Sequence, residues 1–255
     1  MRRLANIFKP DGKTVIVAMD HGMGLSVNPA LDNTGEILEA IVAGGADAIL
    51  TTYGIATRYE DILKNIGLIL RMDGGGSQLG KPGSNQILYT VEDALRIGAD
   101  AMACMGFPGS PWEFESMSNV AQLAAEGHAM GLPLIAEMLP GGFDPSVPNT
   151  IENVTLTTRT GCEYGADVIK TTFVGSVEEY RKVIAASYRP VIVLGGEKTP
   201  NLKALFDVLS DAMTAGASGV AIGRNVWKNP DPEKVTAALV DIVHNGRKPS
   251  ELKGF

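Results

Sequence analysis

The chain has 255 residues, of which 45% are hydrophobic and 20% charged, and its formal net charge is −7. This acidic balance leaves no basic face for nucleic acid or for an anionic membrane surface, and no apolar run approaches the roughly 20 residues that cross a bilayer. The two cysteines, Cys104 and Cys162, form neither a CxxC pair nor the framework of a small secreted scaffold, so we expect buried thiols and a cytoplasmic protein.

Short apolar runs and amphipathic segments alternate along the chain. Eight short, mostly apolar runs predict strands, at residues 14–20, 46–52, 68–71, 101–105, 132–138, 168–171, 190–194 and 219–222. Segments with helical spacing follow them, at residues 32–43, 61–66, 91–97, 115–129, 149–164, 177–186, 201–214 and 232–244. A Gly-rich loop is expected at residues 72–86.

The alternation of strands and helices predicts a parallel sheet covered by helices. Eight strand–helix units in a chain of about 250 residues favour a closed (β/α)8 TIM barrel over an open, doubly wound sheet. No Pro/Ser-rich linker interrupts the pattern, so we interpret residues 1–255 as a single domain.

A short motif recurs where a predicted helix gives way to a strand. It reads Gly-Ala-Asp at residues 45–47, 98–100 and 165–167, and Gly-Ala-Ser at residues 216–218. Glycine adopts the left-handed conformation that ends a helix, and a short polar residue then precedes the buried strand. The repeat supports the count of strand–helix units and carries no direct information on chemistry.

Lys170 ends one of the predicted strands. Side chains alternate between the two faces of a strand, so Lys170 shares a face with Val168 and Thr172. If Val168 points into a core, the lysine amine is buried with it, and an unpaired buried ammonium tends to lose its proton. A neutral amine is a nucleophile. The alternative is a lysine whose amine reaches solvent from the end of the strand.

Two glycine-containing loops follow the last two predicted strands. Gly195 and Gly196 follow one strand, and Gly223 and Arg224 follow the next. Loops in these two positions form the customary phosphate site of a TIM barrel, where glycines let backbone amides approach oxygens and an arginine binds phosphate through two nitrogens. Tight turns are the structural alternative for these glycines.

Two carboxylates are placed to join such a site. Asp20 follows the first strand on the face of Ile16 and Ala18, where catalytic side chains of barrels emerge, although capping of a turn is an alternative. Glu137 lies on the fifth strand and shares a face with Leu139. If that face is inward, Glu137 partners Lys170; if it is outward, the side chain packs under a helix.

Several other kinds of site lack their signature. The GxxxxGK spacing of residues 75–81 is followed by Pro82 where a nucleotide-binding loop needs a hydroxyl for magnesium. The three histidines, His21, His128 and His244, are far apart in the sequence, which disfavours a zinc site built on histidines. No GxSxG elbow occurs and no GxGxxG follows a strand. We therefore expect neither a metal nor another cofactor.

Four stretches together resemble the DeoC/FbaB class I aldolases, especially archaeal-type fructose-bisphosphate aldolase and aminodideoxyheptulosonate synthase. They are residues 18–22 (AMDHG), 168–171 (VIKT), 195–199 (GGEKT) and 219–227 (GVAIGRNVW). The resemblance runs nearly end to end. It implies that Lys170 is the Schiff-base lysine, that Asp20 is an active-site carboxylate, and that the two Gly loops with Arg224 bind phosphate. It also implies a homo-oligomer.

The sequence departs from that family's pattern after the fifth strand. Those aldolases have an acid/base tyrosine in a stretch similar to Met-Tyr-Pro-Arg-Gly, whereas this chain reads Met-Leu-Pro-Gly-Gly at residues 138–142. Leu139 cannot move a proton, so another group must handle the proton of the aldehyde oxygen. Glu137, His21, Tyr53 and a substrate phosphate are the alternatives.

The expected activity is cleavage or formation of a carbon–carbon bond in a phosphorylated ketose, with dihydroxyacetone phosphate or a similar keto phosphate bound through Lys170. The Lys and Gly-Arg-Asn stretches also resemble the autoinducer-2 thiolase, so acyl transfer from a phosphorylated diketone to coenzyme A is one alternative. A non-catalytic barrel that binds a sugar phosphate is another. Specificity for the aldehyde is expected to come from the loops at residues 72–86 and 106–113.

Overall fold

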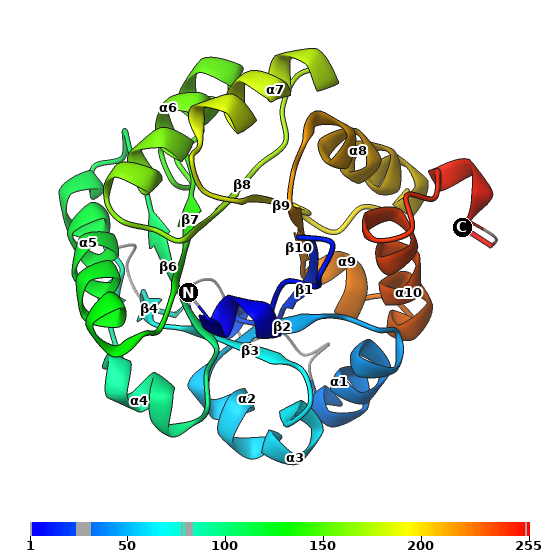
Figure 1. Cartoon of the computed structure of the whole chain (residues 1–255), viewed down its shortest axis with the longest axis horizontal. Helices are drawn as coiled ribbons and strands as arrows, with labels where there is room; N and C mark the ends of the chain where they lie inside the picture. The colour runs from blue at the N-terminus through cyan, green and yellow to red at the C-terminus, as the bar shows by residue number, and fades with distance from the viewer. Residues whose placement is uncertain (1, 24–31, 78, 80–83, 253) are drawn as a thin grey trace.

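The computed structural model describes residues 2–23, 32–77, 79, 84–252 and 254–255, and it forms a closed eight-stranded parallel barrel surrounded by helices (Figure 1). Around the barrel the strands follow the order β1, β2, β3, β6, β7, β8, β9 and β10 before β10 pairs with β1 again. Their bounds are β1 (Thr14–Ala18), β2 (Ala48–Thr51), β3 (Gly67–Arg71), β6 (Ala101–Gly106), β7 (Leu134–Met138), β8 (Val168–Thr171), β9 (Val191–Leu194) and β10 (Gly219–Ile222). The predicted (β/α)8 barrel is confirmed.

The helices agree with the predicted segments except near residue 60, where two short helices replace one. The helix expected at residues 61–66 is wrong in its bounds, because Thr52 caps an earlier helix by accepting a hydrogen bond from the amide of Ile55. The helices are α1 (Thr34–Ala43), α2 (Tyr53–Arg58), α3 (Glu60–Leu63), α4 (Val91–Arg96), α5 (Glu113–Met130), α6 (Ile151–Glu163), α7 (Val177–Ala186), α8 (Leu202–Ala215), α9 (Arg224–Trp227) and α10 (Pro232–Val243). None of the described helices is long and apolar enough to cross a membrane.

A small two-stranded sheet and a short helix were not expected from the sequence. The short strands β4 (Asp73–Gly74) and β5 (Gln86–Ile87) pair antiparallel within the predicted Gly-rich loop, of which residues 78 and 80–83 lie outside the described part. The helix α9 begins directly after Gly223. Both elements lie at the carboxyl ends of the barrel strands and contribute residues to the cavity described below.

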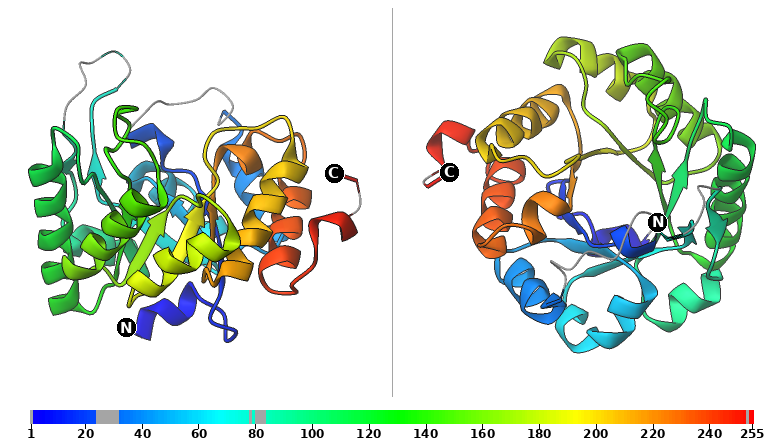
Figure 2. Two further views of the ribbon diagram at one scale, coloured as in Figure 1. Left: turned by 90° about the horizontal axis from the view of Figure 1, so that it is seen from above. Right: turned by 180° about the vertical axis from the view of Figure 1, so that it is seen from behind.

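Side chains alternate between the barrel interior and the layer beneath the helices. The interior is filled by a cluster of twelve buried apolar residues, mostly small or β-branched, including Ile16, Ile135 and Val168. Ile7 belongs to this cluster, and it follows the helix η1 (Arg2–Asn6), which lies across the amino ends of the strands (Figure 2). The N-terminal segment thus closes one end of the barrel, and the carboxyl ends of the strands remain for a site.

The Gly-Ala-Asp motifs join neighbouring strands at the amino end of the barrel. In each motif the aspartate side chain accepts a hydrogen bond from a backbone amide of the preceding barrel strand: Asp47 from Val15 at 2.6 Å, Asp100 from Leu68 at 3.1 Å and Asp167 from Leu134 at 3.0 Å. Each carboxylate therefore extends the backbone ladder by one bond. This is the physical reason for a short acceptor at the start of these strands.

The side chain of Asp47 has three partners within 3.3 Å among the described residues, so its loss is expected to destabilise the fold measurably. Besides Val15 it accepts from His244 Nε2 at 2.8 Å and pairs with Lys9 at 3.3 Å. We expect Asp47→Ala to lower the free energy of unfolding by about 2–4 kcal/mol, because a buried amide and a histidine lose their acceptor. Urea unfolding measures this, with Asp207→Ala on the surface of α8 as the control, expected within about 0.5 kcal/mol of the parent. Equal losses in both variants would contradict the role given to Asp47.

Candidate active site

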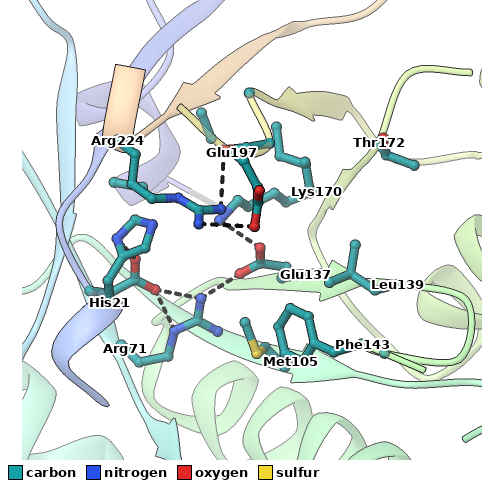
Figure 3. Close-up of a pocket in the computed structure, with 18 of the residues that line it drawn as sticks. His21, Arg71, Met105, Glu137, Leu139, Phe143, Lys170, Thr172, Glu197 and Arg224 are labelled. Carbon is teal, nitrogen blue, oxygen red and sulfur yellow. Dashed lines mark hydrogen bonds and ion pairs between the residues drawn. The ribbon is translucent and has the colours of Figure 1, made fainter. Parts of the chain in front are cut away.

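A cavity of about 490 Å³ opens at the carboxyl ends of the barrel strands. The side chains that face it come from the ends of β1, β3, β6, β7, β8, β9 and β10 and from the loops that follow them (Figure 3). All seven residues singled out from the sequence line it, namely Asp20, Glu137, Lys170, Gly195, Gly196, Gly223 and Arg224. The closure of the barrel brings together residues that are up to 204 positions apart, from Asp20 to Arg224.

Lys170 projects into the barrel and is only 5% exposed. Val168, two residues earlier, belongs to the interior cluster, so the alternation predicted for this strand is confirmed. On the neighbouring strand Ile135 also faces the interior, which turns Glu137 inward and resolves the two orientations that the sequence left open. The register of β7 and β8 places Glu137 beside Lys170, and Glu137 Oε1 lies 2.9 Å from Lys170 Nζ.

Arg71 at the end of β3 is the residue of the site that the sequence interpretation missed. Its guanidinium is buried and binds three carboxylates: Nε donates to Asp20 at 2.7 Å, Nη2 to Glu137 at 2.5 Å and Nη1 to Asp73 at 3.3 Å. Arg71 thereby connects Asp20 to the Glu137–Lys170 pair across the barrel. One signal in the sequence could have indicated this inward position. Arg71 lies two residues after Ile69 on the same strand, so the two side chains share a face, and Ile69 lies in the barrel interior.

The cations of this cluster determine the charge of its carboxylates. Burial opposes ionisation of Asp20, but Arg71, Lys170 and His21 outweigh it and lower the pKa of Asp20 to about 2. Burial is likewise the largest effect on Glu137, and Lys170 and Arg71 outweigh it to lower the pKa of that carboxyl. Burial prevails at Asp73, whose pKa is raised despite Arg71. At neutral pH both carboxyls nearest Lys170 are therefore ionised and can accept protons.

The loops after β9 and β10 lie next to each other on one side of the cavity. Gly196 has a φ of +63°, which favours glycine, and a Cβ on Gly223 would come within 2.6 Å of the His21 ring. Arg224 Nη2 donates to the Gly196 carbonyl at 3.3 Å, and Nη1 lies 3.6 Å from Glu197, which is 91% exposed. The Nε atom of Arg224 is buried and has no hydrogen-bond partner among the described residues.

The side chain of Asn225, in α9, connects the segment after β10 to the loop after β9. Its side-chain amide donates to the carbonyls of Gly195 at 3.2 Å and Glu197 at 2.9 Å, and its oxygen accepts from the amide of Thr199 at 2.8 Å. The side chain is buried, so these bonds are shielded from water. Asn225 therefore sets the shape of the loop that carries Gly195 and Gly196.

The other acid/base alternatives differ in position. His21 lines the cavity, and its pKa is lowered, chiefly by burial and further by Lys170 and Arg224, so the ring is neutral at neutral pH. Tyr53 is not among the residues that line the cavity and instead stacks on Tyr89 with ring centroids 4.9 Å apart. Leu139 lines the cavity two residues beyond Glu137, at the position where the resembled family has tyrosine.

His128 and His244 have structural partners on the outer part of the barrel. His128 Nε2 lies 3.0 Å from Asp167, and His244 bridges Asp11 and Asp47 at 2.8 Å each. Across the described ranges no group of three or more His, Cys, Asp or Glu residues is arranged to hold a metal ion.

Known proteins share this fold and much of this sequence. The DeoC/LacD family aldolase profile matches residues 14–229. The 2-amino-3,7-dideoxy-D-threo-hept-6-ulosonate synthase of Halobacterium salinarum is 34% identical over 245 residues, which cover 96% of this chain and 91% of that protein. The 3-hydroxy-5-phosphonooxypentane-2,4-dione thiolase of Enterobacter sp. (strain 638) is 32% identical over 254 residues, 99% of this chain and 84% of that protein.

A solved structure agrees with both the fold and the family. The structure of a Schiff-base-forming fructose-1,6-bisphosphate aldolase superposes with a TM-score of 0.86 at 29% identity, covering 95% of this chain and 99% of that one. The resemblance inferred from the sequence motifs is thus confirmed over the barrel and its neighbouring segments. The chain belongs to the DeoC/LacD family of aldolases.

Proposed function

We propose that the protein is a metal-independent class I aldolase that binds dihydroxyacetone phosphate, or a similar keto phosphate, as a Schiff base at Lys170. The observation that carries this proposal is the buried Lys170 amine in the cavity, 2.9 Å from an ionised carboxylate that can take its proton. The Schiff-base-forming relative with the same fold supports it.

The proposed reaction begins with attack of the Lys170 amine on the ketone carbon. Glu137 takes one proton from the Lys170 ammonium to free the attacking amine, and after the attack a second proton passes from that nitrogen to the former carbonyl oxygen. Glu137 then gives its proton to the resulting hydroxyl, which leaves as water, so that a cationic iminium remains and Glu137 is ionised again. The iminium withdraws electrons from the neighbouring carbon, so that this carbon can lose a proton to give an enamine or lose an aldehyde by cleavage of the carbon–carbon bond. Asp20 orients substrate hydroxyls and assists the hydration steps.

Glu137 takes over the proton transfer that the tyrosine performs in the resembled aldolases. In the direction of bond formation, the enamine carbon attacks the aldehyde carbon, and the aldehyde oxygen needs one proton. Glu137, protonated when the enamine formed, can supply it. Addition of water to the iminium then releases the ketose and returns the amine. Arg71 holds Glu137 beside the amine and keeps its resting form ionised.

The phosphate of the substrate is assigned to the loops after β9 and β10. Arg224 offers its unpartnered Nε there, and Glu197, being almost fully exposed, can turn away into water when a phosphate displaces it. The backbone at Gly195, Gly196 and Gly223 allows a close approach of the phosphate oxygens.

Reductive trapping tests the proposed function. Incubation with dihydroxyacetone phosphate and borohydride should add the reduced substrate to a single peptide that contains Lys170, as peptide mass spectrometry reports. Unchanged intact mass across several ketose phosphates would rule out a Schiff-base enzyme. Coenzyme A-dependent product formation without release of an aldehyde would instead select acyl transfer, the activity named in the Enterobacter relative.

Asn225→Ala is expected to weaken phosphate recognition more than catalysis. Without the bonds from Asn225 the loop at residues 195–199 loses its fixed shape, so we expect KM for dihydroxyacetone phosphate to rise about tenfold while kcat changes much less. KM for unphosphorylated dihydroxyacetone should stay near that of the parent. Asn245→Ala, an exposed asparagine bonded only to Asp241 in its side chain, is the control. An equal loss with both ketones would contradict the assignment of the phosphate to this loop.

A further inference from the structure

The cavity has a charged side and an apolar side, and Lys170 lies between them. Arg224 and His21 lie to one side of Glu137 and Lys170, whereas Leu139 and Phe143 lie to the other (Figure 3). A substrate held through its phosphate at Arg224 and through its carbonyl at Lys170 would extend toward the apolar side with the remainder of its carbon chain. In the proposed aldol reaction that remainder is the aldehyde partner.

The apolar side has three main contributors, Met105, Leu139 and Phe143. Met105 is the register partner of Glu137 on β6, and Leu139, the first residue after β7, lines the cavity two residues beyond Glu137. Phe143 packs against Phe107 with ring centroids 5.7 Å apart, yet it remains 61% exposed. Apolar side chains that remain exposed on a concave surface gain most from an apolar ligand.

Backbone hydrogen bonds hold this apolar surface in place. The amide of Leu139 donates to the carbonyl of Gly106 at 3.0 Å, and the amide of Gly141 donates to that of Pro108 at 2.7 Å. A Cβ on Gly142 would come within 3.0 Å of the Phe107 ring, so the loop lies directly on that ring. These contacts attach the segment after β7 to the end of β6 and the loop that follows it. Leu139 and Phe143 come from the segment after β7 and Met105 comes from β6, so none of the three lies in the loops at residues 72–86 and 106–113 from which specificity was expected.

We propose that the aldehyde partner is a short, unphosphorylated aldehyde with an alkyl chain, which lies against Met105, Leu139 and Phe143. The inference rests on the proposed function and narrows its substrate class. The ketose joined or cleaved then carries one phosphate, at the Arg224 end, and an alkyl group at the other end. The side chains of Met105, Leu139 and Phe143 offer a second phosphate neither a positive charge nor a hydrogen-bond donor, and the ionised Glu137 nearby would repel it.

Competition between aldehydes tests this inference. With dihydroxyacetone phosphate as the donor, we expect kcat/KM to be at least about tenfold higher for propanal than for glyceraldehyde 3-phosphate, and to rise from acetaldehyde to propanal. A higher kcat/KM for glyceraldehyde 3-phosphate would overturn the inference. That outcome leaves the proposed function intact, because borohydride trapping of dihydroxyacetone phosphate at Lys170 does not depend on the aldehyde. Absence of trapping would count against the proposed function instead.

A matched pair of phenylalanine variants assigns the preference to the apolar side. Phe143→Ala should lower kcat/KM for propanal about fivefold more than for acetaldehyde, because the longer chain loses more contact. Phe114→Ala is the control, since Phe114 is 82% exposed at the start of α5 and does not line the cavity. Equal effects of Phe143→Ala on the two aldehydes would overturn the assignment. Borohydride trapping of both variants verifies that the donor half of the site is intact.

Discussion

Lys170→Ala should lose aldolase activity by about a thousandfold or more and should add no mass on borohydride trapping. The amine is the proposed nucleophile, and no other described lysine lines the cavity. Glu137 keeps its bond to Arg71 in this variant, so the carboxylate is not left unpaired and the fold should persist. Far-UV circular dichroism and urea unfolding verify this, and the kinetic assay then reports the loss of chemistry alone.

An exposed lysine provides the control for this experiment. Lys182 lies on the surface of α7, and Lys182→Ala should keep the activity and the trapping of the parent. If Lys170→Ala still turns over a ketose phosphate at the parental rate, the nucleophile lies elsewhere. If phosphate binding persists and neither protein shows turnover or trapping, a non-catalytic sugar-phosphate-binding barrel becomes the better explanation.

Arg71→Met is expected to have the second large effect, on both stability and activity. The change leaves the buried carboxylates of Asp20 and Glu137 without their guanidinium, which costs about 3–5 kcal/mol of unfolding free energy. We also expect kcat/KM to fall by about a hundredfold or more, because Glu137 is no longer held beside the amine. Arg71→Lys keeps one positive charge but lacks the second and third hydrogen bonds. Its unfolding free energy and its kcat/KM should therefore lie between those of the parent and of Arg71→Met.

The pH profile distinguishes a positioning role of Arg71 from a purely structural one. Arg71 lowers the pKa of Glu137 and Asp20, so its removal raises both values and protonates these carboxylates at higher pH. The acid limb of kcat/KM should therefore move to higher pH in Arg71→Met, and by less in Arg71→Lys, which keeps a positive charge but loses hydrogen bonds to the carboxylates. An unchanged acid limb together with reduced kcat would mean that Arg71 does not set the ionisation of the catalytic carboxylate.

The lowered pKa of Asp20 also predicts how acid affects the stability of the fold. The folded-state pKa of Asp20 is about 2, below its ordinary value of 3.8. The group therefore contributes stability that is fully present above pH 3.8 and is lost as the pH falls through 2. With Arg71 replaced, the folded-state pKa of Asp20 rises toward or above 3.8, so this acid-dependent loss of stability should become smaller or disappear, and urea unfolding between about pH 2 and pH 7 measures the difference.

The sequence by itself determined the barrel and which residues share a strand face with Lys170. Apolar runs separated by helical segments require a buried parallel sheet, and the Gly-Ala-Asp motifs mark where strands begin. Because side chains alternate strictly along a strand, Val168 in the interior also placed Lys170 there. Gly195, Gly196, Gly223 and Arg224 followed from the place of their loops after the last two strands.

Only the tertiary structure decided the orientation of Glu137 and the part played by Arg71. The residues around Glu137 are apolar on both faces of β7, because one face meets the barrel interior and the other meets the helices, so no alternation was visible. Arg71 ends its strand as many surface arginines do. Closure of the barrel places the end of β3 midway between the ends of β1 and β7. Buried charges require partners, so Arg71 becomes the counter-ion of Asp20 and of Glu137, which itself lies beside Lys170.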